Sequence, residues 1–277
     1  MILQFEDKQT NGKLIFTKSE AVFRNFYPMG NKFLTIVFNT GTGQKIKIDE
    51  IEFDFPQNAM LSLNANQTFV FKKPSSIIAW QFDKSFYCIE DHDQEVGCAG
   101  FLFYGSTNTF ILKIDQPELK KIQLLVKVFI EEFNTVDNIQ GEMLRVLLKR
   151  LIIKMTRLAK LQFLDTQNIT DKKLDVIRKF NLLVEKHYKE ERQVKYYASL
   201  INRYPKTLSN LFLLYNHKSP MQVIHERIII EAKRLFNYTD KSVKEISFLL
   251  GFKDEGHFSR FFKNETGVSP SFFKKSI

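Results

Sequence analysis

Apolar residues recur at helical spacing near the C-terminal end of this chain. They predict a short helix, a turn and a second helix between Ser242 and Lys275. Ser242 and Glu245 have the spacing of a capping box, Gly251 permits a tight turn, and Asp254 is placed to cap the second helix. The apolar faces are formed by Val243, Ile246, Leu249, Leu250, Phe258, Phe261 and Phe262. This is the layout of a helix-turn-helix unit, whose second helix enters the major groove of DNA.

A weaker copy of the pattern lies fifty positions upstream. The matching residues are Leu208, Ser209, Phe212, Ser219 and Pro220, which precede Phe258, Ser259, Phe262, Ser269 and Pro270 by fifty positions each. Its helices are predicted at 193–202 and 205–215, with Pro205 in a first turn, where its missing N–H costs nothing. Between the two units, residues 221–236 predict one amphipathic helix of about 24 Å. Such a helix can set the two second helices about one DNA turn apart.

The first 115 residues predict short strands in a small barrel or sandwich, because β-branched and aromatic residues alternate or cluster between turn signals. The turns are expected at 41–43 and 74–76. These strands are rich in aromatic residues, namely Phe33, Phe38, Phe53, Phe55, Phe69, Phe71, Trp80, Phe101 and Phe103. Two interpretations stay open: ordinary core packing, or the lining of an apolar pocket for a small organic effector.

Two amphipathic helices are predicted over residues 116–165. The second runs from Gly141 to Leu164 and carries a short heptad seam formed by Leu144, Leu148, Leu151, Met155 and Leu158. A helix this apolar needs a partner, which is the strands, the first helix or a second subunit. We favour the second subunit and expect a homodimer through this seam. Residues 162–171 are expected to form the hinge to the next part of the chain.

The positive charge of the chain is concentrated in its last part. The formal net charge is +10 for the whole chain. Residues 171–277 hold 21 Lys and Arg against 12 Asp and Glu, whereas residues 1–170 hold 20 against 19. A basic domain attracts DNA phosphates by counterion release. A merely solvated basic face is the alternative, and the tandem helix pattern disfavours it, so we expect double-stranded DNA as a partner.

Residues 180–275 resemble the C-terminal domain of AraC/XylS-type bacterial transcription regulators, over about a third of the chain. In the upstream unit the resemblance rests on Ala198, Leu208-Ser209, Phe212 and Ser219-Pro220. In the linking helix it rests on Arg227-Ile228, Glu231-Ala232-Lys233 and Leu235. It is most specific in the second unit, at Ile246, Gly251-Phe252, Phe258-Ser259-Arg260-Phe261-Phe262-Lys263 and Gly267-Val268-Ser269-Pro270.

The resemblance implies a DNA-binding regulator whose two second helices read the major groove. By position it implies DNA contacts for Lys206, Ser209, Asn210, Gly256, His257, Ser259, Arg260 and Lys263. Arg260 can form a bidentate contact with guanine, and a phosphate contact or an ion pair with Asp254 or Glu255 is the alternative. Two residues depart from the family: Asn210 stands where a basic residue is common, and Gly256 has no side chain to read a base.

The order of strands, helices and tandem units is similar to that of regulators with a cupin-like sensor domain, by pattern only. We therefore expect an α+β multidomain fold. Its parts are a cupin-like β-barrel sensor domain over 1–115, a helical dimerisation segment over 116–165 and an all-α tandem helix-turn-helix domain over 171–277. A small organic effector would act through the sensor domain. RNA polymerase would be a partner if the protein activates transcription.

Enzymatic and metal-binding classes find little support in the sequence. His92 is the only histidine before residue 180, so Asp91, His92 and Asp93 suggest a solvated loop and not a metal site. Cys88 and Cys98 argue against a disulfide framework, and idle thiols are favoured over a redox switch. Neither a membrane-length apolar run nor a secretory signal is found. We expect a bacterial cytoplasmic protein without cofactor, metal or catalysis. The alternatives are a cupin-type enzyme with a DNA-binding tail, and a regulator controlled by a protein partner.

Overall fold

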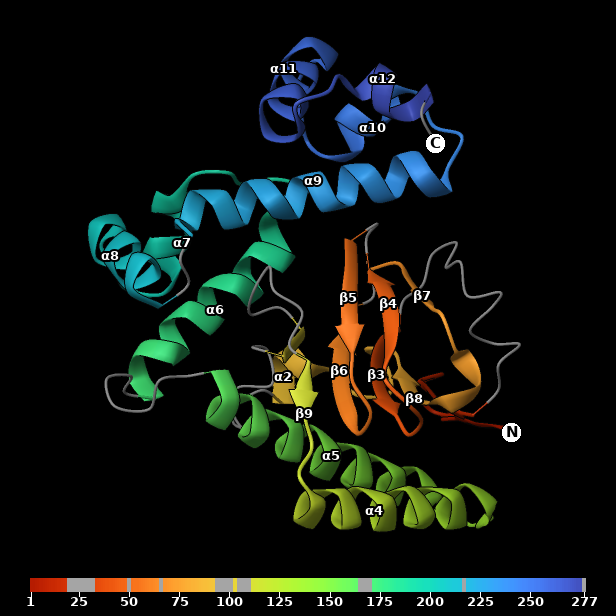
Figure 1. Cartoon of the computed structure of the whole chain (residues 1–277). Coiled ribbons are helices and arrows are strands. Elements are labelled where there is room, and N and C mark those ends of the chain that lie inside the picture. The colour runs from red at the N-terminus through yellow and green to blue at the C-terminus, as the bar shows by residue number, and fades with distance from the viewer. Residues whose placement is uncertain are drawn as a thin grey trace. The chain divides into compact units, whose positions relative to one another are not determined.

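The structure is a computed structural model, and it describes residues 1–18, 33–48, 51–64, 67–92, 102–103, 111–163, 171–215 and 218–275. Backbone contacts divide the chain into two units, Met1–Ile169 and Thr170–Ile277. The described strands all lie in the first unit, and the described elements of the second are helices (Figure 1). The expected α+β class is thereby confirmed. Most of the expected hinge, residues 164–170, lies outside the described residues, as do Asp93, Cys98 and Phe101.

Two antiparallel sheets build the first unit, with strand orders β1-β2-β8-β3-β6-β9 and β5-β4-β7. The larger sheet contains β1 (Ile2–Glu6), β2 (Lys13–Thr17), β8 (Ile77–Phe82), β3 (Leu34–Asn39), β6 (Ala59–Leu63) and β9 (Leu112–Lys113). The smaller sheet contains β5 (Ile51–Phe55), β4 (Gln44–Ile48) and β7 (Phe69–Phe71). The short segments η1 (Pro74–Ser76) and α2 (Ile89–His92) flank β8. The two sheets share a buried core, so they face each other.

The larger sheet is covered on both faces, which explains why its central strands are apolar without interruption. In β3 and β8, Val37 pairs with Ala79, and the neighbouring Ile36 pairs with Trp80. Because side chains alternate along a strand, the first pair lies in the core shared with the smaller sheet. The second pair lies in the core on the opposite face. A strand buried on both faces loses the alternating pattern of a surface strand.

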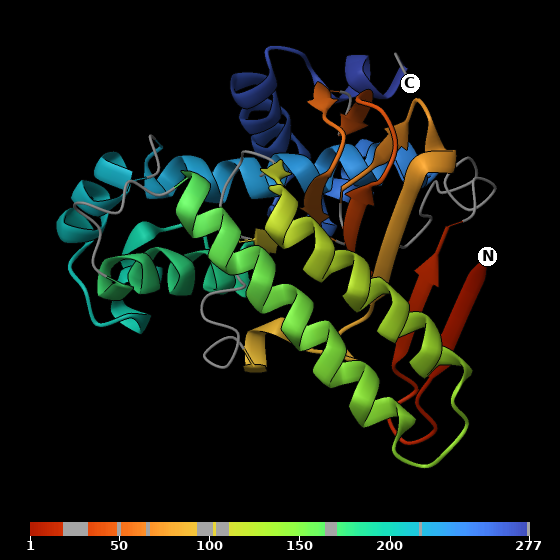
Figure 2. The ribbon, with the colours of Figure 1, turned by 60° about the horizontal axis from the view of Figure 1, so that its bottom comes forward.

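The opposite face is covered by helices α4 (Gln116–Asn134) and α5 (Gln140–Phe163), which lie side by side (Figures 1 and 2). Asp115 caps α4, because its carboxylate accepts a hydrogen bond from the Glu118 N–H at 2.9 Å. Here the expectation from the sequence needs a correction. The seam residues Leu144, Leu148, Leu151 and Met155 are at most 1% exposed, and Leu158 packs against the same core. The seam is therefore covered by this chain's own sheet and α4, and it is not open to a second subunit.

The aromatic side chains of the strands also divide between two cores. Phe38, Trp80 and Phe103 belong to the core under the helices. Phe55, Phe69 and Phe71 belong to the core between the sheets, where Phe53 is partly buried. The described rings thus pack in two separate layers and do not surround one common cavity.

The second unit is built from helices around one core. Its helices are α6 (Asp171–His187), α7 (Val194–Leu200), α8 (Pro205–Tyr215), α9 (Pro220–Tyr238), α10 (Val243–Leu249), α11 (Glu255–Thr266) and α12 (Pro270–Lys275). Figure 1 shows α9 as a long helix, with α7 and α8 near its start and α10 to α12 along its remaining length. At 1.5 Å per residue, its 19 residues span about 28 Å.

The helix ends follow the residues that the sequence marks for them. Ser219 and Ser242 each form a capping box, at the starts of α9 and α10. Asp254 caps α11 by accepting a hydrogen bond from the His257 N–H at 2.7 Å. Gly251 follows α10 with a backbone φ of +74°. The start of α10, the turn at Gly251 and the start of α11 confirm the second helix-turn-helix unit predicted from the sequence, and α7 and α8 lie within the ranges predicted for the first.

Candidate nucleic-acid interface

The second helix-turn-helix unit consists of α10, the turn at Gly251 and α11. Phe258 and Phe262 of α11 are fully buried and anchor this helix in the core of the second unit. Because residues three and four apart share one helix face, this anchoring leaves the opposite face of α11 outward. That face carries the exposed residues Gly256, His257, Arg260 and Lys263, with Ser259 half-buried.

The first helix-turn-helix unit, α7 and α8, repeats this arrangement. Leu208 and Phe212 of α8 are fully buried, at the positions that correspond to the buried Phe258 and Phe262 of α11. The exposed face of α8 carries Lys206 and Asn210, with Ser209 half-buried. All eight residues expected to contact DNA therefore lie on α8 or α11, and six of them are exposed. Their contacts with DNA remain a prediction.

The sequence reading overlooked the apolar end of the α8 face. Leu213 and Leu214 are 62% and 68% exposed. Leu213 stands seven residues after Lys206 and so lies on the same face of α8. The fifty-residue correspondence could have revealed the difference, because it pairs Leu213 with Lys263 of α11. The two outward faces thus differ in chemistry: one ends in a lysine and the other in leucines.

A buried ionic network holds α9 against α6. Arg227 and Glu231 of α9 are 8% and 4% exposed. Nη2 of Arg234 donates a hydrogen bond to Glu231 at 2.6 Å, and the Arg227 guanidinium lies 4.2 Å from the ring centroid of Tyr188. Burial alone would raise the pKa of Glu231, but the hydrogen bond from Arg234 and the charge of Arg227 hold the pKa of this carboxyl below its ordinary value. Burial raises the pKa of Tyr188 to about 12.

Contacts of α9 also reach the second outward-facing helix. Nδ1 of His225 lies 2.7 Å from a carboxylate oxygen of Glu265 in α11, and the His225 ring meets Phe261 edge-on, with 5.0 Å between the centroids. The linking helix contacts α6 through Arg227, which forms an ion pair with Glu185, and contacts α11 through His225.

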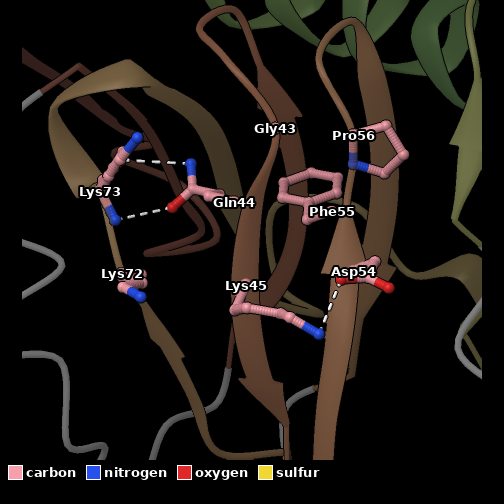
Figure 3. A pocket seen from close by; sticks show the side chains of 8 residues that line it. All are labelled: Gly43, Gln44, Lys45, Asp54, Phe55, Pro56, Lys72 and Lys73. Atoms are coloured by element: carbon pink, nitrogen blue, oxygen red, sulfur yellow. Dashed lines mark hydrogen bonds and ion pairs between the residues drawn. The ribbon is translucent and has the colours of Figure 1, made fainter.

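The first unit contains a pocket of about 320 Å³ on the smaller sheet, lined by Gly43, Gln44, Lys45, Asp54, Phe55, Pro56, Lys72 and Lys73 (Figure 3). The Lys45 ammonium lies 2.7 Å from Asp54, which raises the lysine pKa through a hydrogen bond and the opposite charge. The Gln44 side-chain amide accepts a hydrogen bond from the Lys73 N–H at 2.7 Å and donates one to the Lys73 carbonyl at 3.2 Å. Three lysines against one aspartate give the pocket a positive lining.

Within the described ranges, no three His, Cys, Asp or Glu side chains gather where they could hold a metal ion. His92, the histidine weighed as a ligand, hydrogen-bonds the Cys88 carbonyl and stacks on Tyr87. The helices among the described residues are each too short or too polar to cross a membrane.

A family of known proteins matches part of the second unit. Residues 197–276 match the family described as "Helix-turn-helix domain". The raffinose operon transcriptional regulatory protein RafR of Pediococcus pentosaceus is 29% identical over 111 residues, which are 39% of this chain and 40% of RafR. The HTH-type transcriptional activator RhaS of an Enterobacter species is 30% identical over 87 residues, 31% of each chain. The matched regions thus span well under two thirds of these relatives' length.

One solved structure, ToxT of Vibrio cholerae O395, aligns with 99% of this chain and 95% of its own, at 16% identity and a TM-score of 0.43. Residues 197–276, which run from within α7 through α12, match a helix-turn-helix family and form the helix-turn-helix domain of this chain.

Proposed function

We propose that this protein is a sequence-specific DNA-binding transcription regulator of the bacterial cytoplasm, which places α8 and α11 in two successive segments of the major groove. The repeated anchoring of these two helices carries the proposal. Each helix buries two apolar side chains seven or fewer residues from its start and turns Lys206 and Asn210, or His257 and Arg260, outward. The concentration of positive charge in residues 171–277 supports attraction to phosphates. The role requires no catalytic step.

The test is selection of duplexes from a random DNA library by the full chain, followed by titration of the enriched duplex at several salt concentrations. We expect an enriched motif and an affinity that falls steeply with salt, by a log–log slope of about 0.9 for each phosphate contact. The double variant Lys206→Ala/Arg260→Ala should lose the preference for the motif. A folded chain without affinity for any duplex at low salt would contradict the proposal.

We further propose that the first unit mediates self-association, through exposed apolar side chains and not through the buried seam of α5. Leu124 of α4 and Met143 and Val146 of α5 are exposed, although each lies on a helix with a covered face. Sedimentation of the full chain should show a dimer, and Leu124→Asp/Val146→Asp should shift it to a monomer. A wild-type monomer at high micromolar concentration would contradict this. If the protein is an activator, RNA polymerase is the further partner.

We also propose that the first unit senses a small organic effector. The lysine-lined pocket on the smaller sheet supports an effector that carries an anionic group (Figure 3). A ligand changes DNA affinity only through its different affinities for two protein states, and typical couplings correspond to roughly 5- to 150-fold. A thermal-shift screen of small organic acids, followed by DNA titration with each hit, tests the proposal. Hits that leave DNA affinity unchanged would contradict the proposal. So would hits that raise the melting temperature of the Lys72→Ala variant as much as that of the wild type.

A further inference from the structure

The loop between α6 and α7 lies directly against the turn of the second helix-turn-helix unit. A Cβ atom added to Gly251 would stand only 1.9 Å from the carbonyl oxygen of Lys189 and 3.6 Å from Nη2 of Arg192. This loop belongs to the first helix-turn-helix unit by sequence, because it leads into α7. The two helix-turn-helix units are therefore in contact at a second place, far along the chain from the linking helix α9.

Arg192 makes the specific contacts at this place. Its Nη2 donates a hydrogen bond to the carbonyl oxygen of Leu250 at 2.8 Å. Leu250 is the C-terminal cap residue of α10, and the last carbonyls of a helix lack partners within the helix. The guanidinium also stacks over Phe252, with Cζ 3.6 Å from the ring centroid. One side chain thus holds both the end of α10 and the first aromatic residue of the turn.

Arg192 stays a cation in this half-buried place, because a guanidinium does not lose its proton in proteins. Burial lowers the pKa of this guanidinium, because a partly desolvated charge is disfavoured. A carbonyl dipole and an aromatic face both favour a positive charge, and in partly dry surroundings they do so more strongly than in water. The position therefore selects for a planar, charged group with an in-plane donor.

From Phe252 the contacts continue into α11. The Phe252 ring lies 5.1 Å from that of Phe258, 5.3 Å from that of Phe261 and 5.5 Å from that of His257, by centroids. Phe258 is the buried anchor of α11, and His257 lies on its outward face. A shift of Phe252 would therefore move the start of the helix that is proposed to read DNA.

In the other direction the contacts lead to α8. The hydroxyl of the buried Tyr197 in α7 donates a hydrogen bond to the Glu191 carbonyl at 2.7 Å, next to Arg192 in the chain. The Tyr197 ring packs edge-on against Phe180, at 5.4 Å, and Phe180 packs against Phe212 of α8 at 4.9 Å. A continuous series of contacts thus connects α8 to α11 without passing through α9.

From these contacts we infer that Arg192 is a positioning residue, which fixes α11 relative to α8 and so sets the spacing between the two halves of the DNA site. A contact away from α9 restrains how the two helix-turn-helix units twist about the linking helix. The inference rests on the proposed function for its DNA consequence. Its structural core, a fixed distance between α8 and α11, is independent of DNA.

The DNA-free test is a distance measurement on the full chain. Spin labels are attached through Leu213→Cys and Lys263→Cys, in a Cys88→Ser/Cys98→Ser background. We expect a narrow distance distribution with Arg192 and a clearly broader one with Arg192→Ala. Arg192→Lys, which keeps the charge but not the planar group, should lie between them, and circular dichroism establishes that each variant is folded. Equal widths for all three would overturn the inference.

The DNA test uses the duplex that the wild-type chain selects from a random library, and the same duplex with one or two base pairs inserted between its halves. Each inserted base pair turns one half against the other by about a tenth of a helical turn. Arg192→Ala should bind the selected duplex about tenfold more weakly, the value of one charge-assisted hydrogen bond. It should also lose less affinity than the wild type upon insertion, and should bind an isolated half-site as the wild type does.

Lys186→Ala is the matched control, because it removes the same charge from an exposed position of α6. It should weaken binding to all these duplexes alike and leave the penalty for insertion unchanged. Equal insertion penalties for Arg192→Ala and the wild type would overturn the inference while leaving the proposed function intact. A wild-type chain that selects no duplex would refute the proposed function, and the distance measurement would still decide the role of Arg192.

Discussion

Nε of Arg227 in α9 donates to both carboxylate oxygens of Glu185 in α6, each at 2.8 Å. The same guanidinium reaches Glu231, at 3.4 Å, one turn further along α9. Two carboxylates and one arginine thus share a place from which water is nearly excluded. In such a place a charge that loses its partner is costly, because its hydration is not restored.

We therefore predict that Arg227→Ala lowers the free energy of unfolding of the second unit by about 3–5 kcal/mol, because Glu185 and Glu231 are left without their shared cation. Lys179→Ala is the control. It removes the Lys179–Asp175 pair from the surface of α6 and should cost about 0.3–0.5 kcal/mol. Urea unfolding followed by circular dichroism measures both. Similar losses for the two variants would show that the network contributes no more than a surface pair.

Two glycines with similar backbone angles should tolerate alanine very differently. Gly251 has φ +74° and faces the Lys189 carbonyl, whereas Gly267 has φ +81° and nothing within 4 Å of an added Cβ. Gly267→Ala should cost only the left-handed backbone strain, roughly 1–2 kcal/mol. Gly251→Ala should cost distinctly more, since the loop before α7 must also move away. Thermal unfolding of both variants provides the comparison, and equal shifts in Tm would count against the close contact.

The helices of the second unit could be predicted in detail, because their starts and stops depend on local chemistry. Ser242, Asp254 and Gly251 each determine a cap or a turn within a few residues, and the structure places them there. The partner of α5 could not be predicted in the same way. The pattern of Leu148 and Leu151 shows that one face needs covering, but the covering sheet is formed by residues distant in the sequence.

The contact of Arg192 with Leu250 escaped the sequence analysis for the same reason. Leu250 lies 58 positions away along the chain, and an arginine in a polar loop gives no local signal of burial. The division of the phenylalanines into two cores was also hidden. Periodicity assigns Phe38 and Phe55 to covered faces, but it does not tell which layer covers each one.

Arg260 and Lys263 should differ in what they contribute to DNA binding, since both are exposed on α11 and only a guanidinium forms a bidentate pair with guanine. Arg260→Ala should cost about 1–3 kcal/mol on the selected duplex and relax the preference at one base pair. Lys263→Ala should weaken binding to all duplexes alike and reduce the salt slope by about 1. Titration with the selected and a scrambled duplex separates the two effects. An equal loss on both duplexes for Arg260→Ala would assign it a phosphate contact instead.

The apolar end of α8 offers a gain-of-binding experiment. Leu213→Lys gives α8 the residue that α11 has at the equivalent position, and the exposed side chain can change without disturbing the core. We expect tighter binding to any duplex and a log–log salt slope steeper by about 0.9. Leu213→Gln controls for the loss of the leucine without added charge. A lysine variant that binds no more tightly than the glutamine variant would place this end of α8 away from the phosphates.

In the first unit, Asp7 should make stability depend on pH in the acid range. Its carboxylate accepts hydrogen bonds from the backbone N–H groups of Thr10 and Gln9 and forms an ion pair with Arg145 of α5. These interactions lower the pKa of Asp7 from 3.8 to about 2. A lowered folded-state pKa stabilises the fold above pH 3.8, and this contribution is lost as the pH falls towards 2. Asp7→Asn should remove it, so the stability difference between wild type and variant should shrink across this range. Parallel stability curves down to pH 2 would contradict the assignment.

The unlike ends of α8 and α11 have a consequence for how the proposed regulator would sit beside a gene. Leucines follow Asn210 on one helix, and Lys263 follows Arg260 on the other, so the two halves of a recognised site cannot be interchanged. A site for one protomer is therefore asymmetric and has a defined direction along the DNA. Turning the site end for end would point the same protomer towards the opposite flank, and direct and inverted pairs of sites would bring two protomers together in different ways.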